Sequence, residues 1–133
     1  MATSATESKS KEIYTEVHDR EQFLTILKEN PGIMIFKFGA DWCAPCQTIK
    51  DDVEQYFANT PNNVLCFDLD IDESFDLYAF LKSKKMVTGV PSILAYVKGN
   101  ESYASDFAYS FSGGKDALKI FFDTVNIKAN SIQ

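Results

Sequence analysis

Two cysteines separated by two residues stand near the middle of the chain, in Trp42-Cys43-Ala44-Pro45-Cys46. On the first turn of a helix, this spacing places both sulfurs on one side, close enough to form a disulfide bond. Cys43 would then stand at the helix N-terminus, where free backbone N–H groups and the helix dipole lower the pKa of a thiol. Cys46, one turn deeper, would be suited to attack a mixed disulfide from within. The pattern predicts thiol–disulfide exchange.

Other interpretations of the cysteine pair are open at this point. A zinc site needs four ligands, and only Cys66 and His18 remain to complete one, without the paired spacing of such sites. The two cysteines of the pair could also be present by accident. Cys66 falls in an apolar stretch, which favours a small buried side chain over a regulatory thiol. We therefore expect no metal site, and we assign no role to His18.

Helical and strand patterns alternate around the cysteine pair. Asp19 can cap a first helix, with Gln22 at the capping-box position, and Asn30-Pro31-Gly32 ends that helix. Short and nearly continuous apolar runs predict strands that are buried on both faces, and Lys98-Gly99-Asn100 predicts the turn of an antiparallel hairpin. The predicted strands are residues 33–38, 64–69, 92–97 and 103–111, and the other predicted helices are residues 42–58, residues 72–83 with an Asp72 cap, and residues 117–125.

This order of elements, α-β-α-β-α-β-β-α, predicts an α/β fold. The helices between the first three strands are long enough to serve as crossovers, so at least one pair of strands should run parallel. We expect a central mixed β-sheet flanked by helices on both faces. The chain has 133 residues, of which 45 % are hydrophobic, which is typical of one domain. We place that domain at residues 12–127, between a disordered N-terminal tail, residues 1–11, and a C-terminal tail, residues 128–133.

Two motifs carry a resemblance to a known family. The stretch Phe38-Gly39-Ala40-Asp41-Trp42-Cys43-Ala44-Pro45-Cys46 is similar to the active-site loop of the thioredoxin family, and Val87-Thr88-Gly89-Val90-Pro91-Ser92 is similar to its cis-proline loop. The resemblance covers nearly all of residues 17–126 and implies a thioredoxin fold. It also implies an enzyme that reduces protein disulfides. Cys43 would be the attacking sulfur, Cys46 the resolving sulfur, and a cis Pro91 would face their disulfide.

The resemblance further implies a substrate-binding surface and a set of partners. The surface would be formed by Trp42, Ala44, Pro45 and Val90, beside the two cysteines. A cis proline removes a backbone N–H and leaves neighbouring polar groups free to pair with an extended substrate segment. The partners would be disulfide-containing proteins and a thioredoxin-reductase-like or glutathione-linked reductant, and no bound cofactor is implied.

The sequence departs from the pattern of the family in three ways, of which the third involves a pair of residues. Ala44 replaces the usual Gly at a position that tunes the redox potential, and Gly39 replaces a common Trp, which predicts a looser floor under the loop. Lys37 stands where the family usually has a buried Asp, and Asp68 stands on the neighbouring strand where the family has the paired Lys. Buried charges are tolerable in pairs, so we predict an ion pair with its ends exchanged.

The exchanged pair leads to a hypothesis about the mechanism. Asp68 would accept the proton of Cys46 during resolution, directly or through water, and a protonated Lys37 nearby would favour thiolates. In the alternative arrangement, Lys37 extends to the end of its strand while Asp68 faces water. Catalytic support is therefore assigned to Lys37, Asp68 and Pro91.

Composition and charge limit the classes of partner. The formal net charge is −6, without a cluster of Lys and Arg, which argues against nucleic acid or an anionic membrane as a partner. The N-terminal residues lack the apolar segment of a signal peptide, and no apolar run approaches the ~20 residues of a membrane span. Three cysteines do not resemble the disulfide framework of a secreted protein. We therefore expect a cytoplasmic protein. As a separate expectation, the protein acts as a monomer.

Two other functions are compatible with the sequence. The same chemistry could run in the opposite direction, in a thiol oxidant or isomerase, which a reduction potential of about −120 mV rather than about −270 mV would indicate. The fold could instead serve as a non-catalytic binding module with idle cysteines. Partner binding by Cys43→Ser/Cys46→Ser protein, together with an absence of disulfide reduction by the unaltered chain, would favour the module.

Overall fold

Lys11 is the first residue that the computed structural model describes, and the described part of the chain is residues 11–132. The predicted disordered tail, residues 1–11, therefore lies outside the described residues except for Lys11. The Nζ atom of Lys11 donates hydrogen bonds to the carbonyl oxygens of Pro61 (2.9 Å) and Val64 (2.8 Å). The prediction is wrong for this one residue, because its ammonium group satisfies two carbonyls near the start of a strand.

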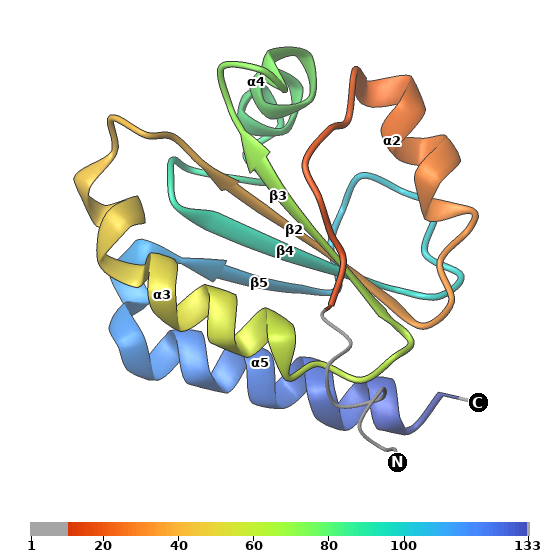
Figure 1. Ribbon diagram of the computed structural model, residues 1–133. Coiled ribbons are helices and arrows are strands. Elements are labelled where there is room, and N and C mark those ends of the chain that lie inside the picture. Colours follow the sequence, from red (N-terminus) through yellow and green to blue (C-terminus); the bar gives the residue numbers. More distant parts are fainter. Residues whose placement is uncertain (1–10, 133) are drawn as a thin grey trace.

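A five-stranded mixed sheet occupies the centre of the domain (Figure 1). The strands are β1 (Ile13–Tyr14), β2 (Ile33–Gly39), β3 (Val64–Asp70), β4 (Ser92–Val97) and β5 (Phe107–Ser110), in the spatial order β1-β3-β2-β4-β5. β2 pairs parallel with β3 and antiparallel with β4, so it is hydrogen-bonded along both edges. β1 pairs parallel with β3, and β5 pairs antiparallel with β4. The predicted mixed sheet and its hairpin are confirmed.

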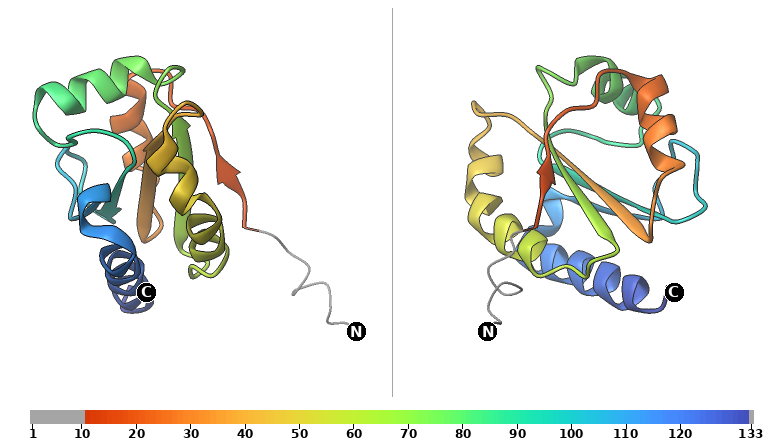
Figure 2. Two further views of the ribbon diagram at one scale, coloured as in Figure 1. Left: turned by 90° about the vertical axis from the view of Figure 1, so that its left-hand side faces the viewer. Right: turned by 45° about the vertical axis from the view of Figure 1, so that its right-hand side comes forward.

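Two helices cover each face of the sheet, as Figures 1 and 2 show. The helical elements are α2 (Arg20–Leu27), α3 (Ala44–Ala58), α4 (Phe75–Ser83), the short 3₁₀ turn η1 (Phe111–Gly113) and α5 (Gly114–Asn130). α2 and α4 pack on the face that carries Phe36 and Phe38 of β2, whereas α3 and α5 pack on the face that carries Ile33 and Ile35. Every residue of β2 is buried, as its continuous apolar pattern predicts. Within residues 11–132, no helix combines the length and the apolar character needed to cross a bilayer.

β2 and β3 each end one residue later than predicted, and two other strands differ more. The structure adds β1, whose two residues are too few to produce a strand pattern in the sequence and which is held by pairing with β3. The last strand covers residues 107–110 instead of 103–111. The side chains of Asn100 and Asp106 hydrogen-bond to backbone groups around this segment and close a loop in place of a longer ladder.

The N-terminal caps of two helices can be compared with their prediction. Asp19 caps α2 as predicted, because its Oδ1 atom accepts a hydrogen bond from the backbone N–H of Gln22 (2.8 Å). α4 was predicted to begin after an Asp72 cap, but Ser74 stands at the cap position. The prediction of an Asp72 cap is wrong, and the side chain of Asp72 is used elsewhere.

The last helix is longer than predicted. α5 continues to Asn130, past the predicted domain boundary at residue 127 and into the predicted C-terminal tail, residues 128–133. Ala129, in the last turn of α5, is buried in the hydrophobic layer between the sheet and helices α3 and α5. This contact holds the final turn against the domain, so the boundary prediction is wrong. A single small residue adds little to an apolar pattern, which is why the pattern ends earlier in the sequence.

An aromatic cluster fills the layer between the sheet and helices α2 and α4. Phe36 of β2 lies at its centre, with ring centroids at 4.8 Å from Phe23, 4.4 Å from Phe67 and 5.6 Å from Tyr96. Phe36 is fully buried. Aromatic rings at such separations attract one another in addition to burying apolar area. The cluster therefore holds the strand that leads to the cysteine pair.

Phe36→Ala should lower the free energy of unfolding by about 3–5 kcal/mol, because the substitution removes buried contacts and leaves a cavity. Denaturant unfolding followed by circular dichroism measures the change. Phe75→Ala is the matched control: Phe75 is 67 % exposed, and the same truncation there should cost less than about 0.5 kcal/mol. Equal losses in the two variants would contradict the central position of Phe36.

Candidate active site

The two cysteines stand where β2 leads into α3. Cys43 is the N-cap residue of α3, and its backbone N–H donates to the carbonyl oxygen of Ala40 (3.2 Å), which closes the turn after β2. A disulfide bond joins Cys43 to Cys46, with their Cα atoms 5.3 Å apart. The position of the pair on the first turn is as predicted, although α3 begins at Ala44 rather than at Trp42.

The start of α3 supplies the electrostatic environment of Cys43. The backbone N–H of Cys46 donates a hydrogen bond to the Sγ atom of Cys43 (3.2 Å). The N–H groups of a first helical turn have no partners within the helix, and together with the helix dipole they favour negative charge. In the reduced protein they would favour the thiolate of Cys43, the form that attacks disulfides. The exposed fraction is 5 % for Cys43 and 3 % for Cys46, so Cys46 is slightly deeper.

The loop before β4 approaches the disulfide from the other side. The Val90–Pro91 peptide bond is cis, as predicted. The carbonyl oxygen of Val90 lies 3.7 Å from the Sγ atom of Cys43. The hydroxyl group of Ser92 donates to the carbonyl oxygen of Gly89 (2.6 Å), which ties this loop to the start of β4. Because Pro91 is buried and Val90 is half-buried, the loop presents Val90 at the surface beside the cysteines.

The indole ring of Trp42 is fixed at the surface by an acidic residue. Trp42 is 67 % exposed, and its Nε1 atom donates to Oδ2 of Asp72 (3.0 Å). The backbone N–H of Asp72 donates in turn to Oδ1 of Asp70 (2.8 Å). Asp72 is the site residue that the sequence analysis missed. A signal was available: β2 and β3 are parallel, so the residues that follow their C-terminal ends must meet at one edge of the sheet.

The four residues predicted to bind substrate lie at the same end of the sheet. Trp42 and Ala44 are exposed, and Pro45 and Val90 are half-buried. Trp42, Ala44 and Pro45 belong to the turn that holds Cys43, and Val90 reaches the same sulfur from the loop before β4. The structure therefore brings all four into one region around the disulfide.

Lys37 and Asp68 face each other on β2 and β3. They are direct neighbours in the parallel register, and Nζ of Lys37 lies 3.4 Å from Oδ1 of Asp68. The side chain of Lys37 is only 8 % exposed, whereas that of Asp68 is 41 % exposed. The predicted ion pair is confirmed, with its cation buried and its carboxylate half in solvent. The alternative arrangement, in which Lys37 extends to the end of its strand while Asp68 faces water, is wrong for Lys37, whereas Asp68 does reach solvent in part.

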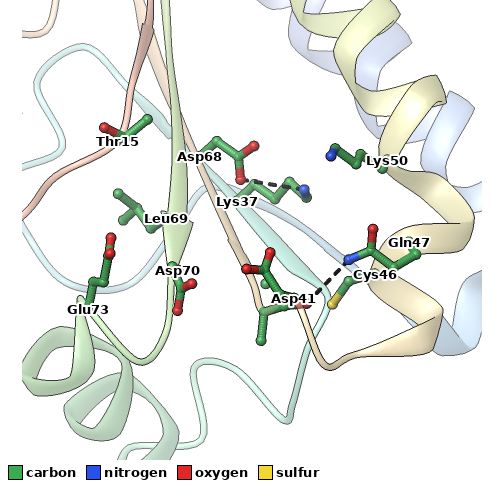
Figure 3. Close-up of a pocket in the computed structure, with 12 residues that line it drawn as sticks. Thr15, Lys37, Asp41, Cys46, Gln47, Lys50, Asp68, Leu69, Asp70 and Glu73 are labelled. Carbon is green, nitrogen blue, oxygen red and sulfur yellow. Dashed lines mark hydrogen bonds and ion pairs between the residues drawn. The ribbon is translucent and has the colours of Figure 1, made fainter.

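A pocket of about 250 Å³ lies between this ion pair and Cys46 (Figure 3). Lys37, Gly39, Cys46 and Asp68 all line it. Gly39 has no side chain to close the gap: a Cβ atom added there would lie 3.5 Å from Sγ of Cys46 and 3.9 Å from Cε of Lys37. The looser floor predicted at Gly39 therefore corresponds to an open space between the sulfur and the lysine. The other charged residues that line the pocket are Asp41, Lys50, Asp70 and Glu73.

Cys66 is a buried thiol in β3 and forms no disulfide. Burial raises the pKa of the Cys66 thiol to about 11, and the nearby Thr60 hydroxyl and Lys11 ammonium oppose this shift only in part. The thiol is therefore protonated at neutral pH, as expected of a small buried side chain. Among residues 11–132, no three His, Cys, Asp or Glu side chains lie close enough together to hold a metal ion.

Comparison with known proteins identifies the family of this chain. The family model described as Thioredoxin matches residues 14–122, which include the cysteine pair and the cis-proline loop. The chain belongs to the thioredoxin family. The disulfide of Cys43 and Cys46, preceded by Trp42, is the redox centre of a thioredoxin-type dithiol–disulfide oxidoreductase. The activity that goes with it is the reduction of protein disulfides.

Individual relatives agree with this assignment. Thioredoxin-2 of Saccharomyces cerevisiae is 26 % identical over 87 residues, which cover 65 % of this chain and 79 % of the yeast protein. The mitochondrial thioredoxin of Bos taurus is 26 % identical over 121 residues, which cover 85 % of this chain and 67 % of the bovine protein. The solved structure of Trichomonas vaginalis thioredoxin superimposes with a TM-score of 0.66 at 19 % identity, over 84 % of this chain and 96 % of that one. The predicted thioredoxin fold is confirmed.

The buried thiol of Cys66 should make the protein less stable at alkaline pH. An unperturbed thiol ionises near pH 9.0, whereas the folded protein keeps Cys66 protonated up to about 11. Between these values unfolding releases a proton, so the free energy of unfolding should fall as the pH rises, by on the order of 2 kcal/mol. Denaturant unfolding of the oxidised protein at about pH 8 and about pH 11 measures the loss. Cys66→Ala protein, as the control, should lose less, and an equal loss would contradict the assignment.

Proposed function

We propose that Cys43 attacks the disulfide bonds of substrate proteins and that Cys46 resolves the resulting mixed disulfide. The position of Cys43 as the N-cap of α3, beside the exposed Trp42 and Ala44, is the observation that supports these roles. The Cys43 thiolate bonds to one substrate sulfur, and the other substrate sulfur leaves as a thiolate and takes up a proton. Cys46 then loses its proton and attacks the sulfur of Cys43, which forms the Cys43–Cys46 disulfide and releases the second substrate thiolate.

Each cycle passes two electrons to the substrate and leaves this protein oxidised. Protein substrates and a reductase partner follow from its membership of the thioredoxin family. We propose that the reductant is a thioredoxin-reductase-like or glutathione-linked enzyme and that the chain acts as a monomer. The cytoplasmic location stays a prediction, because the bovine relative is a mitochondrial thioredoxin.

The proposed substrate surface consists of Trp42, Ala44, Pro45 and Val90. An extended substrate segment would lie against the backbone of Val90 and contact the exposed indole ring, as peptides do when they add to an exposed strand or loop. Two observations support this arrangement: the carbonyl oxygen of Val90 lies 3.7 Å from the Cys43 sulfur, and Asp72 holds the indole in one orientation. The surface would thus present the substrate sulfur to Cys43.

Asp68 is proposed as the acceptor of the Cys46 proton during resolution. Asp68 and Cys46 line the same pocket, and the carboxylate side chain is 41 % exposed. A proton can therefore pass from the sulfur to the carboxylate through water in the pocket, and from there to bulk solvent. Lys37 lies 3.4 Å from the carboxylate at the wall of this pocket.

Cys46→Ser protein should accumulate mixed disulfides on Cys43, because the sulfur that resolves them is missing. After incubation with a disulfide-bonded protein such as insulin, mass spectrometry under non-reducing conditions identifies the modified residue. Cys43→Ser is the matched control and should capture nothing, whereas the unaltered chain should reduce insulin when a dithiol is supplied. Capture by Cys66, or an unaltered chain without reductase activity, would contradict the proposed function.

Asp68→Asn should slow the resolution step, by about 10²-fold if the carboxylate acts as a general base, and should flatten the pH dependence of that step. Single-turnover kinetics with a preformed mixed disulfide measures the rate across pH. Glu73→Gln is the control, because Glu73 is an exposed carboxylate that lines the same pocket. A pH profile of Asp68→Asn that matches the unaltered chain removes Asp68 from the mechanism.

A further inference from the structure

Lys37 carries a charged group in the interior of the protein, where it pairs with Asp68. Its side chain is 8 % exposed, so most of its charge is withdrawn from water. Asp68 is its hydrogen-bond partner within the described chain, at 3.4 Å. Charge-assisted hydrogen bonds are usually about 2.7–2.9 Å long, so this pair is loose. The positive charge of Lys37 is therefore only partly neutralised by its partner.

The absence of a side chain at Gly39 leaves the space between Lys37 and the sulfur of Cys46 open. A methyl group placed on Gly39 would touch both the Sγ atom of Cys46 (3.5 Å) and the Cε atom of Lys37 (3.9 Å). Cε is the carbon that carries the ammonium group. Figure 3 shows the side chain of Lys37 running from β2 across the pocket toward α3, the helix that holds Cys46. No side chain on Gly39 separates the sulfur from the cation.

Other charges face the same pocket, and their exposure decides how strongly each acts on Cys46. They are Asp68 and Asp70 from β3, Asp41 from the turn before α3, Lys50 from α3 and Glu73 from the segment before α4. Asp41, Lys50 and Glu73 are exposed, and the two aspartates of β3 are half-buried. Water and salt screen exposed charges strongly, whereas a buried charge beside a buried sulfur is screened least. Among the charges that line the pocket, that of Lys37 is therefore the one that water screens least.

We propose that Lys37 stabilises the thiolate of the resolving cysteine, Cys46, and so acts as an electrostatic positioning residue in the exchange reaction. The inference rests on the proposed roles of Cys43 and Cys46. Cys46 must lose its proton before it can attack the mixed disulfide, and burial alone opposes this loss. Cys66 of β3 illustrates the direction of this effect, because burial raises the pKa of its thiol. At Cys46, the positive charge of Lys37 would offset this unfavourable effect of burial on the thiolate.

Two consequences follow for the chemistry. The proton leaves Cys46 more easily, so the mixed disulfide is resolved sooner and the substrate is released before it can react with other thiols. A stabilised thiolate also stabilises the reduced protein, which makes the Cys43–Cys46 disulfide easier to reduce. Lys37 would therefore influence both the rate of the second step and the reduction potential.

Lys37→Met tests the proposal, because it keeps an unbranched side chain of similar length and removes the charge. In a Cys43→Ser/Cys66→Ala background, Cys46 is the one remaining thiol of the three cysteines, and its thiolate absorbance can be titrated alone. Loss of a nearby opposite charge should raise the midpoint by about one pH unit or more, a tenfold or larger change. In the chain with all three cysteines, a tenfold loss of reduced-state stability makes the potential about 30 mV more negative.

Two further variants separate charge from structure. Lys37→Arg keeps the positive charge and should restore a midpoint close to that of the unaltered chain. Lys50→Met removes an exposed charge from the same pocket and should shift the midpoint less than Lys37→Met does. If Lys37→Met fails to fold, Lys37→Gln provides the same comparison.

An unchanged or lower midpoint after removal of the Lys37 charge overturns the proposal. This outcome can be distinguished from failure of the proposed function, which is judged by the capture of substrate on Cys43 in Cys46→Ser protein. Normal capture with an unchanged midpoint would leave the exchange roles in place and remove Lys37 alone. An absence of capture would remove the exchange roles themselves, whatever the titration shows.

Discussion

The C-terminal end of β2 is held on all sides, and the position of the redox centre depends on this constraint. β3 and β4 bind the two edges of the strand, and helices cover both of its faces. The chain then makes one tight turn, closed by the hydrogen bond between Ala40 and Cys43, before α3 begins. Because strand and turn leave little freedom, Cys43 is fixed at the helix N-terminus and at the edge of the sheet. The disulfide is thus held by a rigid strand and turn near the surface of the protein.

The same constraint makes a charged residue within β2 costly. Removing an ammonium group from water carries a desolvation penalty that a single, loose ion pair does not fully offset, and an apolar residue of similar size often packs with equal or better stability. Lys37 is buried at such a position, and its carboxylate partner stays half in solvent. The stability of the fold therefore gives no reason for a lysine here. A lysine that acts on the neighbouring sulfur of Cys46 gives the position a chemical reason.

The surroundings of the disulfide combine buried sulfurs with an exposed aromatic ring. Both cysteines are almost completely buried in the oxidised protein, whereas the ring of Trp42 lies largely in solvent. Asp72 orients that ring, and the loop at Val90 approaches the Cys43 sulfur from the other side. A rigid, exposed aromatic side chain loses little conformational entropy when a partner covers it. The indole ring, the loop at Val90 and the two sulfurs are consequently positioned by different segments of the chain that meet at one edge of the sheet.

Most of the fold and the reacting atoms could be predicted from the sequence because they depend on local order. Cys43 and Cys46 lie within one helical turn, and the helices and most strands follow apolar patterns of neighbouring residues. The cis Pro91 was predicted through a motif of six residues. The strand β1 and the bond between Trp42 and Asp72 were missed, since each requires segments far apart in the sequence to meet.

The ion pair of Lys37 and Asp68 was only partly predictable from the sequence. Their residue types suggested a pair, but only the packed structure decided that the cation is buried and that its partner reaches solvent. The open space at Gly39 was likewise decided by the way α3 lies against β2. The sequence by itself therefore determined that two sulfurs lie close together at the start of a helix, because their spacing of three residues fits one helical turn. The tertiary structure decided which charged groups lie near the two cysteines and how far water reaches them. Both depend on every element that packs around the cysteines.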